Sequence, residues 1–206
     1  MTWEHPKIPS SYEAETIGKT LYELVLKNKS KNIIEFGSFG GWTAVCMAMA
    51  LRDSGGEGTV TSYDIGNQII SVPLTKKSEH TGLYSEIDRL GVEKYINFEI
   101  ADYYQWIEQP FKGDEFDFLY VDVGNTQQTI KLLRQKCQPH IDNGAVVCFE
   151  GGGVYRDAFV GRANSGYWLD NHDIAELNPV REEVRFITLF EFDNIITDSL
   201  SVLSRE

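Results

Sequence analysis

The residues with the most distinctive chemistry lie at 32–45, where one acid precedes three glycines in Asn-Ile-Ile-Glu-Phe-Gly-Ser-Phe-Gly-Gly-Trp-Thr-Ala-Val. Gly37, Gly40 and Gly41 allow a sharp turn and a close approach of the backbone to a ligand. The helix expected after them would direct unpaired N–H groups toward the same place. Because Glu35 would repel a pyrophosphate there, the pattern favours a ligand that carries an ammonium or sulfonium group.

Acids also stand at or next to the ends of several apolar stretches that are typical of strands, namely Glu35, Asp64, Asp122 and Glu150. In open α/β sheets, ligands bind outside the carboxyl ends of the strands, where the strand order reverses. One acid in such a place is commonly a turn residue or a helix cap. Four of them in this order, with the glycine loop first, predict a single shared crevice.

The elements that must position these acids alternate between strand and helix. Strands are expected at 33–36, 58–63, 95–100, 116–121 and 144–149, and helices at 12–27, 42–51, 78–90 and 126–137. Two further β-like segments, 184–192 and 199–204, are separated by a loop short enough to imply an antiparallel hairpin. The order predicts an α/β fold with a doubly wound, mostly parallel, seven-stranded sheet and a C-terminal antiparallel hairpin.

Length and composition limit the class of protein. The 206 residues, 42% hydrophobic and 24% charged, suit one globular domain over 1–206, with 1–30 as an N-terminal helical cover. A net charge of −12 argues against nucleic acid and anionic membranes as partners, because phosphates are bound through clustered Lys and Arg. The sequence shows neither a long apolar window nor a signal-peptide pattern at residues 1–6, so a cytoplasmic location is expected.

The cysteines are expected to be small buried residues. Cys46, Cys137 and Cys148 are odd in number and lack the paired spacing of a zinc site. A disulfide framework is therefore not expected.

On these residues the chain resembles the class I S-adenosylmethionine-dependent methyltransferases, and within them the small-molecule O-methyltransferases related to the catechol and caffeoyl-coenzyme A enzymes. The first motif of that group is similar to Glu-x-Gly-Thr-x-x-Gly-Tyr-Ser-Ala. The corresponding residues here are Glu35, Gly37, Ser38, Gly41, Trp42, Thr43 and Ala44. The resemblance runs from about residue 13 to the end and implies a Rossmann-like fold, S-adenosyl-L-methionine as cofactor, and methyl transfer to a small hydroxylated metabolite.

The same resemblance implies a set of cofactor-binding residues. Glu35, with Gly37, Ser38, Phe39, Gly41 and Thr43, would hold the methionine part of the cofactor. Asp64 would accept the ribose hydroxyls, since a carboxylate can take two such donors at once. The adenine would lie among Ile65, Ala101, Asp102 and Val123, with Asp102 accepting its amino group and Asp122 close by.

The catalytic set of the metal-dependent relatives is matched only in part. Asp122 corresponds to their first metal ligand and Glu150 to the second, but Gly151 and Asn125 stand where the third ligand and a lysine base would be. Two oxygen ligands with water can hold Mg²⁺. In the alternative, Asp122 orients the cofactor or substrate, and Glu150 caps the following loop or acts as a general base.

The segment 151–180 is expected to build the substrate pocket, because loops of this length in compact domains are usually functional. Arg156 and Arg162 would hold a substrate carboxylate or phosphate, with Trp168 and His172 beside them. Ordinary surface ion pairs are the alternative for the arginines, and a homodimer contact is the alternative for the aromatic residues.

Three classes of function remain after the sequence. The first is an active methyltransferase, and the second is a protein that binds the cofactor without catalysis. The third, a nicotinamide-dependent oxidoreductase, is disfavoured because the loop lacks the G-x-G-x-x-G spacing and carries Glu35.

Overall fold

The computed structural model describes residues 3–8, 16–65, 81–110, 115–123, 127–150 and 200–203. The chain divides into two compact units, 1–120 and 121–206, which are treated separately below. The expected substrate segment with Arg156, Arg162, Trp168 and His172 lies outside the described residues, and so does the expected strand at 184–192.

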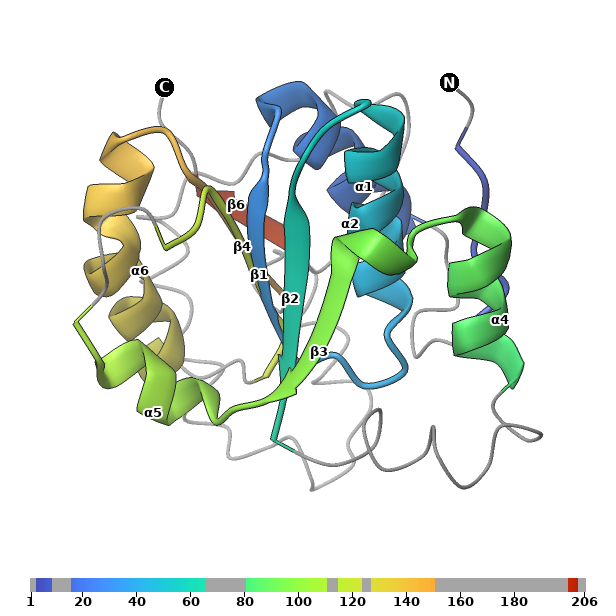
Figure 1. Ribbon diagram of the computed structural model, residues 1–206. Coiled ribbons are helices and arrows are strands. Elements are labelled where there is room, and N and C mark those ends of the chain that lie inside the picture. The colour runs from blue at the N-terminus through green and yellow to red at the C-terminus, as the bar shows by residue number, and fades with distance from the viewer. Residues whose placement is uncertain are drawn as a thin grey trace, which may run out of the picture. The chain divides into compact units, whose positions relative to one another are not determined.

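The first unit contains alternating strands and helices (Figure 1). In chain order they are α1 (Thr16–Asn28), β1 (Asn32–Phe36), α2 (Trp42–Asp53), β2 (Thr59–Asp64), α4 (Thr81–Leu90), the 3-10 turn η1 (Glu93–Tyr95), β3 (Ile96–Ile100), α5 (Tyr103–Glu108) and β4 (Phe118–Val121). The strands of this unit follow the order β3-β2-β1-β4. Both β1 with β2 and β2 with β3 are parallel, as the sequence predicted.

The start of β4 is tied to the start of β1 by Asp117. Its backbone N–H donates to the carbonyl of Asn32 at 2.9 Å. Its carboxylate accepts the backbone N–H groups of Lys31 and Asn32 at 2.8 and 3.0 Å.

The strand order reverses at β1, because β2 and β3 lie on one side of it and β4 lies on the other. In α/β sheets this is where ligands bind.

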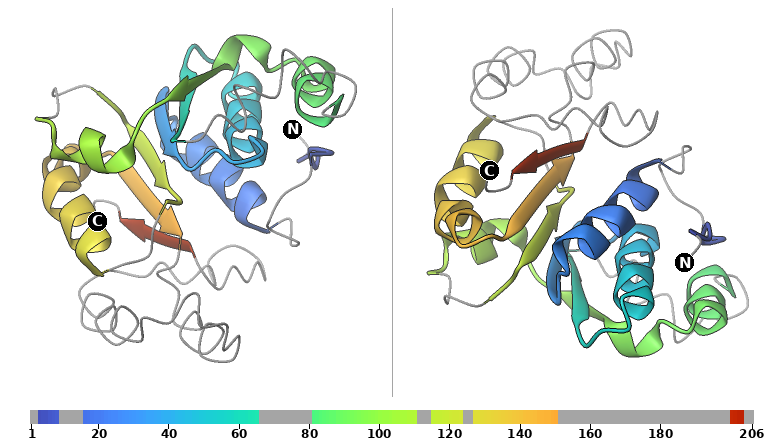
Figure 2. Two further views of the ribbon diagram at one scale, coloured as in Figure 1. Left: turned by 90° about the horizontal axis from the view of Figure 1, so that it is seen from below. Right: turned by 90° about the horizontal axis from the view of Figure 1, so that it is seen from above.

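Helices cover both faces of this sheet, and Figure 2 shows α2 and α5 on opposite sides of β1 to β3. The central strands are apolar because neither face meets water: all of β4 is buried, and only Asn32 of β1 is exposed. On the α5 side, the ring of Phe36 stacks on Tyr63 at 5.0 Å and contacts Trp106 at 4.7 Å between centroids. The doubly wound arrangement is thus confirmed for the first unit.

The second unit contains α6 (Gln127–Asp142), β5 (Val146–Glu150) and β6 (Leu200–Leu203). β6 pairs antiparallel with β5, with Val147 opposite Leu203. The closing antiparallel strand expected near 199–204 is therefore present. Its predicted hairpin partner at 184–192, which would be the seventh strand of the sheet, lies outside the described residues and stays a prediction.

Helix α6 is longer than the sequence indicated, since it passes the expected end at Cys137 and includes Pro139. Proline inside a helix loses one backbone hydrogen bond and normally ends it. Here Cys137, His140 and Ile141 are all buried. Burial on both sides of Pro139 offsets the lost bond and carries the helix on to Asp142.

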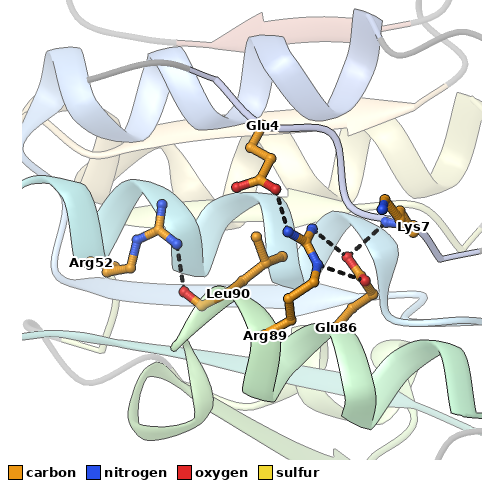
Figure 3. A network of polar contacts seen from close by, with 6 residues as sticks. All are labelled: Glu4, Lys7, Arg52, Glu86, Arg89 and Leu90. Carbon is orange, nitrogen blue, oxygen red and sulfur yellow. Dashed lines mark hydrogen bonds and ion pairs between the residues drawn. The ribbon is translucent and has the colours of Figure 1, made fainter.

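The N-terminal residues 3–8 form no helix and lie against α1, α2 and α4 of the same unit (Figure 3). The ring of Trp3 meets Tyr22 edge-on at 5.3 Å, and the ring of His5 lies 5.7 Å from that of Trp42. The backbone N–H of Lys7 donates to Glu86 at 3.0 Å. Because 1, 2 and 9–15 lie outside the described residues, the helical part of the expected cover is α1 from Thr16 onward.

We predict that Gly18→Ala destabilises the protein, although alanine is normally the better helix former by about 1 kcal/mol. The added methyl would lie only 2.6 Å from the Cys46 sulfur and 2.8 Å from Cζ3 of Trp42. Overpacking of this kind costs about 1–3 kcal/mol. Urea unfolding should show the loss, while Lys19→Ala on the same helix, which removes a 3.6 Å surface ion pair with Glu23, should change the free energy of unfolding by less than about 0.5 kcal/mol. A more stable Gly18→Ala protein would contradict this packing.

A second prediction concerns acid stability. The pKa of Glu86 is lowered, first by its hydrogen bonds with Arg89, with further contributions from the Lys7 N–H and from nearby positive charge. A carboxyl with a lowered folded-state pKa stabilises the protein fully above its unfolded pKa and loses that contribution as the pH falls toward the folded value. Unfolding free energies should therefore decrease more steeply between about pH 5 and pH 3 in the wild type than in Arg89→Met. Parallel curves would contradict this assignment.

Candidate functional site

The glycine loop turns the chain from β1 into α2. Gly37 and Gly41 have φ angles of 97° and 78°, in the left-handed region that favours glycine. The N–H of Gly37 donates to the carbonyl of Tyr63 at 2.9 Å, and that of Gly41 donates to the carbonyl of Ser38 at 2.7 Å. No side chain caps α2, whose N-cap is Gly41. The first N–H groups of α2 are therefore left for backbone, water or ligand acceptors.

Beneath this loop lies the carboxylate of Glu35, which has no solvent exposure. One of its oxygens accepts a hydrogen bond from the Thr43 hydroxyl and the other accepts one from the Ser62 hydroxyl. A hydroxyl has a single hydrogen, so Ser62 must accept in its contact with Ser38. Two hydroxyl groups, from α2 and β2, thus donate to one buried carboxylate, and the loop joins this network because the Ser38 hydroxyl donates to Ser62.

This geometry defines how Glu35 can act on a ligand. Because the side chain is fully buried, its charge acts through the loop above it and through the field it creates there, which is stronger in a low-dielectric interior than in water. A negative charge in this place would attract a cationic ligand above the loop and repel a phosphate. The sequence placed Glu35 at the cofactor, and the structure places it under the loop.

The ends of β1, β2 and β3 meet around Asp64. The Asp64 carboxylate accepts the backbone N–H of Phe39 at 3.0 Å, and its carbonyl accepts the N–H of Ala101 at 3.3 Å. Two large apolar side chains here are open to solvent, with Phe39 57% and Ile65 74% exposed. A carboxylate beside exposed apolar side chains suits a ligand that has both hydroxyl groups and a flat ring.

Asp102 has a structural task in addition to any ligand contact. It is the N-cap of α5, and its carboxylate accepts the N–H of Tyr104 at 2.8 Å. No helix was expected from the sequence at Tyr103–Glu108. The available signal was Asp102 itself, because aspartate is a preferred N-cap. The following Tyr104 presents a ring that is 47% exposed.

The remaining acids belong to the second unit. Asp122 directly follows β4 and is half-buried, and Val123 after it is exposed. Glu150 ends β5, but its side chain lies outside the described part of the structure. Their convergence with Glu35 and Asp64 in one crevice stays a prediction.

The metal site also stays a prediction. Within the described ranges, no group of three or more His, Cys, Asp or Glu side chains could hold a metal ion. The side chain of Glu150 and residues 151–199 lie outside those ranges. The two-ligand site at Asp122 and Glu150 is thus left for experiment.

The cysteines behave as the sequence indicated. Cys46, Cys137 and Cys148 are free and buried. Burial raises the pKa of Cys137 to about 12. Burial, followed by the charge of Glu35, raises the pKa of Cys46 well above its usual value. All three thiols are therefore unreactive packing groups at neutral pH.

A search of the described helices finds none that is both long and apolar enough to span a bilayer.

Comparison with known proteins gives the family. A family model described as a methyltransferase domain matches residues 34–150, more than half of the chain. The protein therefore belongs to the methyltransferase domain family, and the resemblance found in the sequence is confirmed. The matched region includes the end of β1 with Glu35, the glycine loop, Asp64 and the acids that follow β4 and end β5.

One curated relative and two solved structures illustrate the similarity. Tapetum-specific methyltransferase 1 of Arabidopsis thaliana is 27% identical over 123 residues, which are 59% of this chain and 46% of that protein. The chain thus spans less than half the length of this relative. Cofactor-bound Rv0187 from MTB has a TM-score of 0.59 at 18% identity and covers 98% of this chain and 85% of its own. The O-methyltransferase TomG from Streptomyces achromogenes, in complex with SAM, has a TM-score of 0.57 at 16% identity and covers 96% and 83%. At these identities the two structures show the fold alone, which is the Rossmann-like α/β fold.

We predict that Thr43→Val lowers the free energy of unfolding by about 1–3 kcal/mol, because it leaves a buried carboxylate oxygen of Glu35 without this donor while conserving side-chain size. The matched control is Thr61→Val on β2, a half-buried position where the same substitution should cost little. Chemical denaturation of both variants tests this. Equal stabilities would show that the Thr43 hydrogen bond does not stabilise the loop.

Proposed function

We propose that the protein transfers a methyl group from S-adenosyl-L-methionine to a small hydroxylated metabolite. The observation that carries the proposal is the buried Glu35 carboxylate under the glycine loop, with Asp64 at the end of the neighbouring strand. Two carboxylates in these places suit a cationic ligand that also bears ribose hydroxyls. Membership of the methyltransferase domain family supports the same ligand.

In this proposal each side chain has a defined task. Asp64 accepts the ribose hydroxyls, and its hydrogen bond with the Phe39 N–H holds it in place. Ile65 and Val123 supply apolar contact for the adenine, and Ala101 with Asp102 borders its amino edge. The loop residues Gly37, Ser38 and Gly41 bind the methionine portion, whose positive charge is attracted by the Glu35 carboxylate.

The bound cofactor would supply an activated methyl group, and the protein would supply alignment. Orientation of two reactants in one site can contribute about 7–11 kcal/mol to lowering a barrier. Asp122 and Glu150 are the proposed groups for orienting or deprotonating the acceptor, either directly or with Mg²⁺. Arg156, Arg162, Trp168 and His172 are the proposed substrate contacts.

The second candidate is cofactor binding without catalysis. It is favoured by Asn125 and Gly151, which replace the base and third ligand of the metal-dependent relatives. A nicotinamide-dependent oxidoreductase is less consistent with the site, because the charge of the buried Glu35 would disfavour a pyrophosphate on the glycine loop.

Ligand-dependent melting separates these functions. A ligand that binds only the folded state stabilises it by RT ln(1 + [L]/Kd). S-adenosylhomocysteine should raise the melting temperature and NADH should not. Transfer of a labelled methyl group to hydroxylated acceptors, with Mg²⁺ or with EDTA, would then distinguish an enzyme from a binder. A shift with NADH alone would overturn the proposal.

We predict that Asp64→Asn weakens S-adenosylhomocysteine binding about tenfold or more, because hydrogen bonds to a charged group contribute about 1.5–3 kcal/mol. Asparagine still offers an acceptor for the Phe39 N–H, so the melting temperature should change little. Glu57→Gln, an exposed acid just before the start of β2, removes the same charge at the opposite end of that strand and should leave the affinity unchanged. Isothermal titration measures both.

Asp102→Ser separates the two tasks of that residue. Serine is also a good N-cap, so the stability of α5 should be retained. Weaker S-adenosylhomocysteine binding at unchanged stability would support the adenine contact. Unchanged binding would leave Asp102 as a cap alone.

A further inference from the structure

We propose that Arg89 on α4 is a positioning residue for the cofactor site, which it affects through a brace formed by the N-terminal segment 3–8 and α4. The inference rests on the proposed function, because it concerns the affinity of the glycine loop for the S-adenosyl cofactor. No atom of Arg89 is required to touch that cofactor. Three sets of contacts within the first unit connect Arg89 to the glycine loop.

The first contacts join α4 to the N-terminal segment (Figure 3). Arg89 donates twice to the buried Glu86 carboxylate, at 2.8 and 2.7 Å, and also pairs with Glu4. The same carboxylate accepts the backbone N–H of Lys7 at 3.0 Å. Glu86 is thus bonded on one side by its own helix and on the other by the N-terminal segment, whose attachment is completed by Arg89.

The second contacts join the N-terminal segment to the beginning of α2. The ring of His5 lies 5.7 Å from that of Trp42, the first residue of α2 and the neighbour of Gly41. Ile8 is buried, and Trp3 packs on Tyr22 of α1. One stretch of six residues therefore contacts α4, α1 and the end of the glycine loop.

The third contact joins α4 to the loop itself. An ideal Cβ on Gly41 would lie 2.9 Å from a methyl group of Leu83 and 3.2 Å from the ring of Phe98. Leu83 therefore packs directly over the Gly41 backbone, which it holds in the left-handed conformation with φ of 78°. Movement of the first turns of α4 would loosen Gly41 and the start of α2.

The end of α4 has its own attachment, because a guanidinium nitrogen of Arg52 donates to the carbonyl of Leu90 (Figure 3). Without Arg89, the N-terminal segment would lose its Glu4 ion pair with α4 and keep the Lys7 hydrogen bond to Glu86, so its contact with Trp42 and the packing of α4 at Leu83 would both be less restrained. The expected consequence is a glycine loop that samples more conformations and binds its ligand more weakly.

The test compares wild type, Arg89→Met and Asp117→Ala as full chains, titrated with S-adenosylhomocysteine. Coupling from a residue outside a site typically changes affinity by a few-fold to about thirtyfold, and we expect three- to tenfold weaker binding for Arg89→Met, as roughly the middle of that range. Asp117→Ala removes the acceptor of the Lys31 and Asn32 N–H groups, at 2.8 and 3.0 Å, at the start of β1 and outside the brace. It should lower stability without changing affinity, which controls for a general loss of stability.

Hydrogen exchange distinguishes positioning of the loop from general stabilisation, because a general loss of stability would not accelerate exchange at the loop selectively. Amide exchange at Gly41–Val45 should accelerate in Arg89→Met more than exchange in β4. Leu83→Ala, which removes the contact with Gly41 directly, should reproduce both effects even if Arg89→Met folds poorly.

The outcomes separate the two proposals. Wild-type protein that does not bind S-adenosylhomocysteine overturns the proposed function and this inference with it. Wild-type binding with the same Kd in Arg89→Met and Leu83→Ala overturns the inference alone.

Discussion

The buried charge of Glu35 is the constraint on which the first unit depends. A carboxylate without solvent contact is costly unless hydrogen bonds compensate it, and here the hydroxyls of Thr43 and Ser62 do so. These donors come from α2 and β2, so the two elements must be in place before the charge can be accommodated. Ser38 extends the same network into the loop. The hydrogen bonds of Glu35 thus connect β2, α2 and the glycine loop.

Packing transmits this order to the surrounding helices. The backbone of Gly41 is covered by Leu83 of α4, while Gly18 of α1 lies within van der Waals range of Trp42 and Cys46 in α2. A Cβ at either glycine would clash with these neighbouring atoms, so both positions require a residue without one. The N-terminal segment then bridges α4 and Trp42 through Glu86, Arg89 and His5. The start of α2 is thus enclosed from several sides.

Family membership and site chemistry carry different parts of the functional argument. The methyltransferase domain match identifies the family, whereas one fold hosts many reactions and does not by itself identify an acceptor. The affinity for a cationic, hydroxylated ligand is argued from Glu35 and Asp64, which belong to neighbouring strands. We propose that the acceptor is selected by Asp122, Glu150 and the segment 151–180.

The sequence alone determined features that depend on local pattern. Alternating apolar stretches and turn residues predicted β1 to β5, α2, and the position of Asp64 at the end of its strand. What required the tertiary structure were contacts between distant residues and competitions between local and long-range effects. Examples are Ser62 beside Glu35, Arg89 with Glu4, and the passage of α6 through Pro139. Residue spacing indicates which face of a helix or strand is apolar, but tertiary packing decides which residues contact that face. Packing also determines whether a local preference, such as the tendency of proline to end a helix, prevails.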